Sequence, residues 1–214
     1  MSQDSYDLPF SELIAPDTSR SIGINGPPQY GWKEGNTYNL DAIRKESTCT
    51  STEQQLTLNP DTCYQNERII PSMLATIERE TTLDEGQAQA LCENLCRGLA
   101  FTQGPPGTGK TFLGVALVKA LLASRQETDS RPILVVCMTN HALDSFLGGL
   151  RSAGLTRFAR FGRGSKELWT AAHSISALSR RTKQSVPLRK KYGLAKNQTE
   201  GLYLSSVLVH ILFG

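Results

Sequence analysis

The chain has 214 residues, of which 39% are hydrophobic, and it carries a formal net charge of +3. This length supports one sizeable core, or one domain with part of a second. The polar, acidic amino terminus excludes a secretory signal peptide, and the longest apolar run, near residues 207–213, is too short to span a bilayer. We therefore expect an intracellular protein, cytoplasmic or nuclear, that does not associate with membranes.

Charge is distributed unevenly along the chain. Residues 1–93 carry 15 acidic and 6 basic side chains, whereas residues 151–214 carry 12 basic and 2 acidic ones. Within the basic segment, residues 165–200 are expected to be helical. Such an excess of positive charge favours a polyanionic partner, and a solvated basic surface is the alternative interpretation.

Residues 1–80 are expected to form an irregular arm ahead of a regular domain. Prolines and glycines interrupt every apolar run up to residue 40, and residues 45–62 are rich in the polar side chains typical of loops. Short helices are predicted near residues 39–45 and over residues 71–80.

The regular domain is predicted to start with a helix. Asp84 and Glu85 place negative charge in its first turn, and Gly98 is the expected C-cap. Cys92 and Cys96 lie one turn apart on this helix, but no Cys/His pair follows at zinc spacing, so two half-buried helix positions are favoured over a metal site. The five cysteines of the chain form an odd, scattered set, which favours reduced thiols over a disulfide framework.

Strands and helices alternate in the segments that follow. In chain order the prediction is strand 99–103, helix 110–125, strand 133–138, helix 141–151 and strand 157–161. This βαβ pattern predicts an α/β fold built on a parallel sheet flanked by helices. The second strand is apolar on both faces, as a central parallel strand should be.

A phosphate-binding template lies between the first predicted strand and the next helix. Gly107 and Gly109 can adopt backbone angles closed to other residues, so that consecutive N–H groups turn inward around phosphate oxygens. Lys110 would reach the β- and γ-phosphates, and the Thr111 hydroxyl would ligate Mg²⁺; these two are the candidate catalytic residues. A glycine- and proline-rich turn that binds nothing is the alternative. The candidate nucleotide-binding residues are Gln87, Gly104, Pro105, Pro106, Gly107, Thr108, Gly109, Lys110, Thr111 and Phe112.

Three further features are expected around this loop. The amide of Gln87 can donate to and accept from an adenine edge, although an ordinary exposed helix residue is the alternative. Thr139 and Asn140 follow the second strand, where they could hold a nucleic-acid phosphate, cap the next helix, or do both. Arg160 and Arg163 follow the third strand and could contact backbone phosphate.

These motifs resemble those of superfamily 1 helicases, in the order found in the Upf-like (nonsense-mediated-decay) RNA helicases. The segments that carry the resemblance are Leu83–Gln87, the glycine-rich loop, Val135–Asp144 and Arg160–Arg163. The likeness covers roughly residues 8–165 and is greatest to the NFX-type zinc-finger-containing members. It implies that residues 81–214 form part of a RecA-like P-loop helicase domain.

The resemblance also implies roles and ligands. Gln87 would contact adenine, Lys110 and Thr111 would hold the phosphates of ATP and Mg²⁺, and Thr139, Asn140 and Arg163 would lie toward single-stranded RNA. The implied partners are single-stranded or structured RNA, with DNA as the alternative, and proteins of RNA silencing or RNA surveillance.

One departure from the helicase pattern is clear. Helicases of this group carry a strand that ends in Asp-Glu, and no apolar run of this chain is followed by an acidic pair. We therefore expect the amino-terminal part of a helicase, truncated before that motif, with inefficient turnover by the chain alone. Two other interpretations stay open: an AAA-type P-loop ATPase, and a catalytically inactive module that binds nucleotide or RNA.

Overall fold

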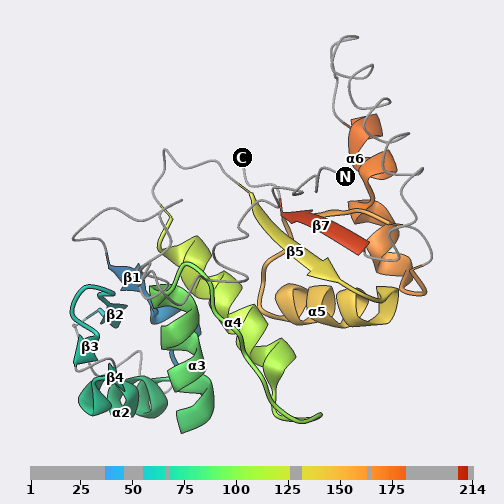
Figure 1. Ribbon diagram of the computed structural model, residues 1–214. Coiled ribbons are helices and arrows are strands. Elements are labelled where there is room, and N and C mark those ends of the chain that lie inside the picture. Colours follow the sequence, from blue (N-terminus) through green and yellow to red (C-terminus); the bar gives the residue numbers. More distant parts are fainter. Residues whose placement is uncertain are drawn as a thin grey trace, which may run out of the picture. The chain divides into compact units, whose positions relative to one another are not determined.

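The computed structural model describes residues 37–45, 55–65, 68–125, 132–162, 165–181 and 207–211. The chain divides into two compact units, Met1–Ser124 and Arg125–Gly214 (Figure 1). Among the described residues, no helix is long and apolar enough to cross a membrane.

In its described residues, the first unit combines short antiparallel strand pairs with helices. Strand β1 pairs with β2, and β3 pairs with β4, both antiparallel. The elements of this unit are β1 (Tyr38–Asn39), η1 (Asp41–Ile43), β2 (Thr57–Leu58), β3 (Tyr64–Gln65), β4 (Arg68–Ile69), α2 (Pro71–Glu80), α3 (Glu85–Cys96) and α4 (Lys110–Ala123). The predicted helices at 71–80 and 110–125 are thus confirmed, and η1 is a single short turn inside the predicted 39–45 helix.

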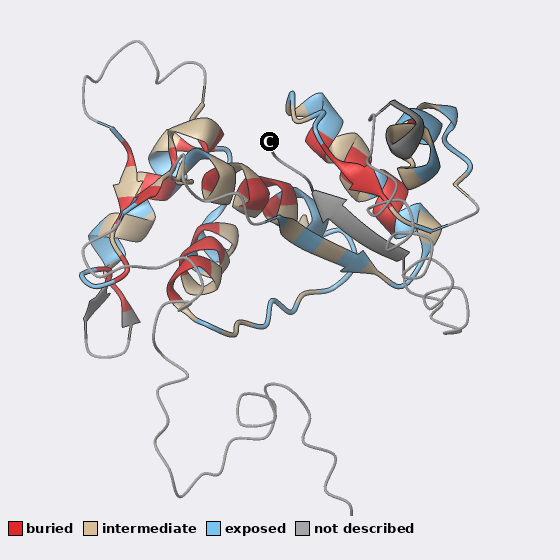
Figure 2. Cartoon of the chain, turned by 90° about the horizontal axis from the view of Figure 1, so that it is seen from above, coloured by how far each residue is buried: buried red, intermediate tan, exposed pale blue. Residues whose placement is uncertain are grey.

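The core of this unit joins its amino-terminal strands to its helices. Leu40 follows β1, Leu58 belongs to β2, and both are fully buried. Ile77 of α2 and Leu91 and Leu95 of α3 are fully buried as well (Figure 2). Residues from the segment expected to be an irregular arm therefore belong to the same hydrophobic cluster as α3 and α4.

Two predictions near the glycine-rich loop were wrong. Residues 99–103 form no strand, and Phe101 is 83% exposed. A strand needs a hydrogen-bonded neighbour, and none of the described strands pairs with this run. Helix α3 ends with Arg97 as its C-cap in an extended conformation, so a left-handed glycine at position 98 is not required.

The second unit is a three-stranded sheet with helices. Its elements are β5 (Ile133–Cys137), α5 (Asn140–Ser152), β6 (Ala159–Arg160), η3 (Leu168–His173), α6 (Ile175–Arg181) and β7 (Val207–Ile211). The strand order is β5-β7-β6, and β7 runs antiparallel to both of its neighbours. The fold is therefore α/β, with the strands at 133–138 and 157–161 and the helix at 141–151 confirmed within a few residues.

The prediction of a parallel sheet is not borne out by the described strands. Strands β5 and β6 share one direction, as a βαβ unit requires, but β7 lies between them and supplies their hydrogen-bond partners. Helix α5 packs on β5 through an apolar face that includes Leu143, Leu147 and Leu150, all buried. Leu134 and Val136 of β5 are about half exposed, so this strand is not buried on both faces (Figure 2).

Candidate nucleotide-binding site

The glycine-rich loop enters α4 through two left-handed glycines. Gly107 has φ of 86° and Gly109 has φ of 75°, in the region that disfavours any residue with a Cβ. Gly109 is also the N-cap of α4, and because it has no side chain, the first N–H groups of the helix receive no side-chain cap. These backbone donors, at the positive end of the helix dipole, suit an anion such as a phosphate.

Helix α4 holds the loop on the core of the first unit. Leu113, Ala116 and Ala120 recur at helical spacing and are buried in the cluster that includes α3. The residues that would face a ligand are outside this core, since Lys110, Thr111 and Phe112 are exposed. The helix is thus anchored by one face while its first turn faces solvent.

The side chain of Lys110 folds back onto its own loop. Its ammonium donates to the carbonyl oxygens of Gly104 and Pro105, each at 2.7 Å. The hydroxyl of Thr108 donates to the same Pro105 carbonyl at 2.9 Å. The cation therefore lies at the mouth of the loop, held by neutral acceptors that a charged phosphate would outcompete.

Gln87 joins helix α3 to the loop. Asp84 and Gln87 form a capping box: the Asp84 carboxylate accepts from the Gln87 backbone N–H at 2.8 Å, and the Gln87 side-chain oxygen accepts from the Asp84 N–H at 3.2 Å. The Gln87 side-chain nitrogen then donates to the Thr108 carbonyl at 3.2 Å. Each end of the amide thus has one partner, and the second N–H and second lone pair of the amide are the groups that an adenine edge would use.

Close packing between the Gln87 amide and the loop explains why position 109 is a glycine. A Cβ at Gly109 would collide with the side-chain nitrogen of Gln87, and a Cβ at Gly104 would lie 2.7 Å from the Thr108 hydroxyl oxygen. At Gly107 a Cβ would meet nothing within 4 Å, so only the backbone angle favours glycine there. Sequence reasoning placed Gln87 beside the loop, but it did not identify Asp84 as the cap or Thr108 as the contact.

A divalent cation has few protein ligands here. Among the described residues, no three His, Cys, Asp or Glu side chains gather as a metal site. The exposed Thr111 hydroxyl, in the first turn of α4, is the protein oxygen that the loop offers to Mg²⁺. It fits a cation that is otherwise held by phosphate oxygens and water.

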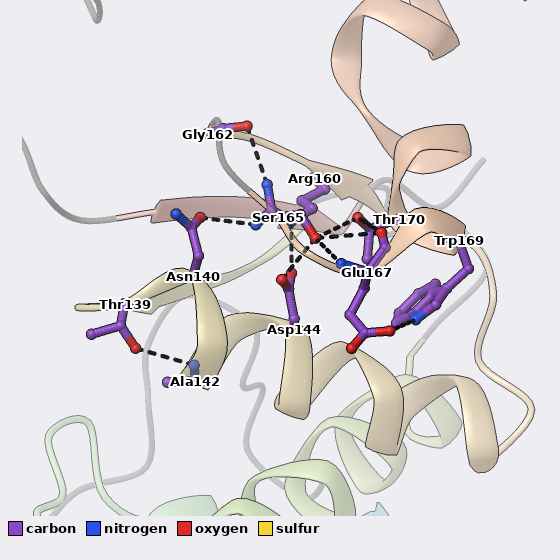
Figure 3. A network of polar contacts seen from close by, with 10 residues as sticks. All are labelled: Thr139, Asn140, Ala142, Asp144, Arg160, Gly162, Ser165, Glu167, Trp169 and Thr170. Atoms are coloured by element: carbon purple, nitrogen blue, oxygen red, sulfur yellow. Dashed lines mark hydrogen bonds and ion pairs between the residues drawn. The ribbon is translucent and has the colours of Figure 1, made fainter.

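Thr139, Asn140 and Arg160 lie in the second unit, where polar contacts gather around the amino end of α5 (Figure 3). Thr139 is the N-cap of α5, with its hydroxyl accepting from the Ala142 N–H at 3.1 Å, so the capping interpretation is confirmed. Asn140 accepts from the guanidinium of Arg160 at 2.9 Å. The two neighbouring residues therefore have different partners, one within the helix and one on β6.

Arg160 is buried, and each of its three guanidinium nitrogens donates a hydrogen bond. Only 4% of it is exposed, and besides Asn140 its guanidinium donates to Asp144 at 3.0 Å and to the carbonyl of Gly162 at 3.1 Å. The Asp144 carboxylate also accepts from the Ser165 hydroxyl at 2.7 Å. Charge-assisted bonds to a buried carboxylate are strong, so Arg160 links β6 to α5.

Two parts of this network escaped sequence reasoning, and one predicted residue lies beyond the described chain. Ser165 and Thr170 are joined at 2.8 Å and complete the network, but nothing in their sequence context distinguishes them from loop residues. Arg163 lies outside the described residues, as do residues 182–200 of the basic segment.

A glycine-rich loop with left-handed glycines, an uncapped helix start and a lysine at the first helical position defines a P-loop nucleotide-binding protein. The comparison with protein families agrees, since the family model described as "AAA domain" matches residues 82–201. The chain belongs to this AAA domain family.

The curated relatives are helicases and a zinc-finger protein. The chain is similar to mouse NFX1-type zinc finger-containing protein 1 (49% identity over 84 residues, 37% of this chain and 4% of that protein). In Schizosaccharomyces pombe it resembles "Helicase required for RNAi-mediated heterochromatin assembly 1" (39% over 108 residues, 50% of this chain and 10% of the relative) and "ATP-dependent helicase upf1" (34% over 99 residues, 45% and 10%).

These matches confirm the resemblance to Upf1-like superfamily 1 helicases, and helicase names among the relatives favour that class over an unrelated AAA-type ATPase. The chain spans a tenth or less of the length of the relatives named above. No solved structure matches it.

Proposed function

We propose that this chain binds ATP with Mg²⁺ as part of an ATP-dependent RNA helicase. The observation that carries the proposal is the first turn of α4, where the left-handed Gly109 leaves the N–H groups without a side-chain cap and the exposed Lys110 folds its ammonium back onto the loop. Lys110 would leave the Gly104 and Pro105 carbonyls for the β- and γ-phosphates, and the Thr111 hydroxyl would ligate Mg²⁺. The Mg²⁺ ion would neutralise part of the phosphate charge.

The nucleic-acid role is assigned to the second unit. Thr139, Asn140 and Arg163 are proposed to lie toward single-stranded RNA, with the amino end of α5 offering N–H groups to a phosphate. Buried Arg160 would act through Asn140, whose side-chain oxygen it holds, rather than touch phosphate itself. The names of the relatives support RNA silencing and RNA surveillance as the processes, with proteins of those pathways as partners.

The nucleotide site is tested with Lys110→Ala in the full 214-residue chain. A charge-assisted contact to phosphate contributes about 1.5–3 kcal/mol, so ATP affinity should fall by roughly 10- to 150-fold. A fluorescent ATP analogue titrated in the presence of Mg²⁺ gives the dissociation constants. Lys119→Ala, nine residues further along the same helix, is the matched control and should bind like the wild type.

Equal affinities of the Lys110→Ala variant and the wild type would remove the P-loop assignment. Circular dichroism of all three proteins checks that α4 is intact. An equal loss of affinity in the Lys119→Ala variant would show that general charge on the helix, rather than the loop contact, attracts the nucleotide.

A further inference from the structure

Three buried thiols lie together in the first unit, away from the glycine-rich loop. Cys63 lies between β2 and β3, and its sulfur is 3.1 Å from that of Cys96, at the carboxyl end of α3. Cys92 precedes Cys96 by one turn of the same helix, and all three residues are at most 1% exposed. The candidate nucleotide site uses none of them.

The geometry favours a bond between two sulfurs over a metal site. Among the described residues, no three His, Cys, Asp or Glu side chains, these thiols included, are arranged so that they could hold a metal ion. A disulfide is about 2.05 Å long, so the Cys63 and Cys96 sulfurs need to approach by only about 1 Å. Cys63 belongs to the turn between two strands of two residues each, and its thiol donates to the Pro60 carbonyl oxygen at 3.4 Å.

We propose that Cys63 and Cys96 are a redox modification site, at which a low-molecular-weight disulfide oxidises the pair to an intramolecular disulfide. The resting state is the reduced pair, as the scattered cysteines of the sequence predict. Because both sulfurs are buried, the oxidant reaches them when the short turn between β2 and β3 opens locally.

The chemistry proceeds by two thiol–disulfide exchanges. The Cys63 thiolate attacks one sulfur of the small disulfide, forms a mixed disulfide and expels a thiolate. The Cys96 thiolate then attacks the Cys63 sulfur, closes the protein disulfide and expels the second thiolate. The two cysteine protons end on these leaving groups, and the two electrons lost by the cysteines reduce the small disulfide to two thiols.

The environments of the three thiols determine which of them attacks first. The hydrogen bond from Cys96 lowers the pKa of Cys63, which makes Cys63 the first nucleophile. The pKa of Cys96 is raised, most by the same hydrogen bond and next by burial. The contribution of the hydrogen bond disappears once Cys63 is in a mixed disulfide. Burial, together with the nearby Cys63 and Glu93 charges, raises the pKa of Cys92 to about 12, so Cys92 stays a thiol and does not compete.

The bond would tie the β2–β3 turn to the end of α3 that is remote from Gln87. Cys63 and Cys96 are 33 residues apart, and a closed loop of that size restricts the unfolded chain. The oxidised chain should therefore melt at a higher temperature. The capping box at the start of α3 is not involved, so ATP-analogue binding should stay within about twofold of the reduced chain.

The test incubates the full chain with oxidised glutathione, alkylates the remaining thiols, and maps peptides by mass spectrometry without reduction. The expected result is one linked peptide pair containing Cys63 and Cys96, a rise in Tm of about 5 °C or more, and reversal of both by dithiothreitol. Cys92→Ala should keep the linked pair, whereas Cys96→Ala should lose both the link and the Tm rise.

The wild-type measurement stands by itself if a variant fails to fold. A glutathione adduct on Cys63 without ring closure would overturn the proposal. So would a linked pair that contains Cys92, Cys49 or Cys137, or a Cys63–Cys96 link that forms only after urea has unfolded the chain.

Discussion

At the scale of single residues, two glycines of the loop serve different purposes. Gly107 is glycine because of its backbone angle alone, whereas Gly109 also leaves room for the amide of Gln87. The phosphate-binding template predicted the special backbone angles of both glycines, because it has glycines at fixed spacing where the backbone turns around a phosphate. The close approach of Gln87 was not predictable, because it depends on how α3 packs beside α4.

This difference gives a prediction. Gly107→Ala should destabilise the first unit by about 1 kcal/mol through backbone strain. Gly109→Ala should cost more, because the new Cβ also displaces the Gln87 side chain, and the double variant Gly109→Ala/Gln87→Ala should recover part of the loss. Urea unfolding of the wild type, the two glycine variants, Gln87→Ala and the double variant measures these costs, with a coupling of about 0.5–3 kcal/mol expected for neighbours in contact. Equal costs for the two glycine variants, with no coupling to Gln87, would contradict the packing argument.

At the scale of elements, helices were easier to predict than strands. Helices α2 and α4 begin at the predicted residues because their apolar periodicity and helix-start signals are local. Strand β7 could not be anticipated as the partner of β5 and β6, since it comes from an apolar run more than 40 residues beyond β6. The 99–103 run has the composition of a strand, but composition does not supply a neighbour.

The buried Arg160–Asp144 pair connects two of these elements and carries the next prediction. Asp144→Ala leaves an unpaired guanidinium in a site where both partners are nearly inaccessible, so unfolding should become easier by about 3–5 kcal/mol. The double variant Asp144→Leu/Arg160→Met removes both charges and should cost much less. Urea unfolding of this unit is monitored by the fluorescence of Trp169, in a Trp32→Phe background that leaves Trp169 as the remaining tryptophan.

Trp169 is a suitable reporter because it lies in the same region as the ion pair. Its ring packs edge-on against Phe158, and the Arg151 guanidinium lies 5.0 Å from its centroid. A loss below about 1 kcal/mol in the Asp144→Ala variant would mean that the pair is solvated in solution, as surface ion pairs are.

At the scale of the whole molecule, the basic carboxy-terminal segment should govern RNA binding. Affinity for an unstructured single strand should fall linearly with salt on a double-logarithmic plot, with a slope of about −0.7 for each phosphate neutralised. Replacing Arg189, Lys190 and Lys191 by Gln should make the slope shallower, whereas Arg20→Gln/Lys33→Gln in the acidic half should not. Parallel titrations with RNA and DNA of one sequence decide the preference. A slope unaffected by the carboxy-terminal changes would make the basic segment a solvated surface.

Phosphoryl transfer by the whole chain is predicted to be slow. Transfer to water needs a phosphate cradle, Mg²⁺ held by protein groups, a residue that orients the attacking water, and a cation at the developing charge. In the proposed function, residues 104–111 would supply the cradle, and the Thr111 hydroxyl would be one ligand of Mg²⁺. The adjacent acidic pair of the sequence, Asp84-Glu85, starts α3, with Asp84 committed to the capping box. This acidic pair follows no apolar strand, and we assign neither carboxylate the role of orienting the attacking water.

Among the described residues, Arg160 is no substitute for the cation at the developing charge. Arg160 is buried against Asp144, so it is not available to a phosphate, and an arginine at the transition state contributes about 10³–10⁵ in rate where it acts. We therefore expect ATP binding with turnover far below about 1 s⁻¹, and no duplex unwinding. Phosphate release is measured with excess RNA, beside the Lys110→Ala variant as the control for contaminating ATPases. RNA-stimulated turnover at about 1 s⁻¹ or above, abolished by that substitution, would mean that a carboxylate of this chain orients the water after all.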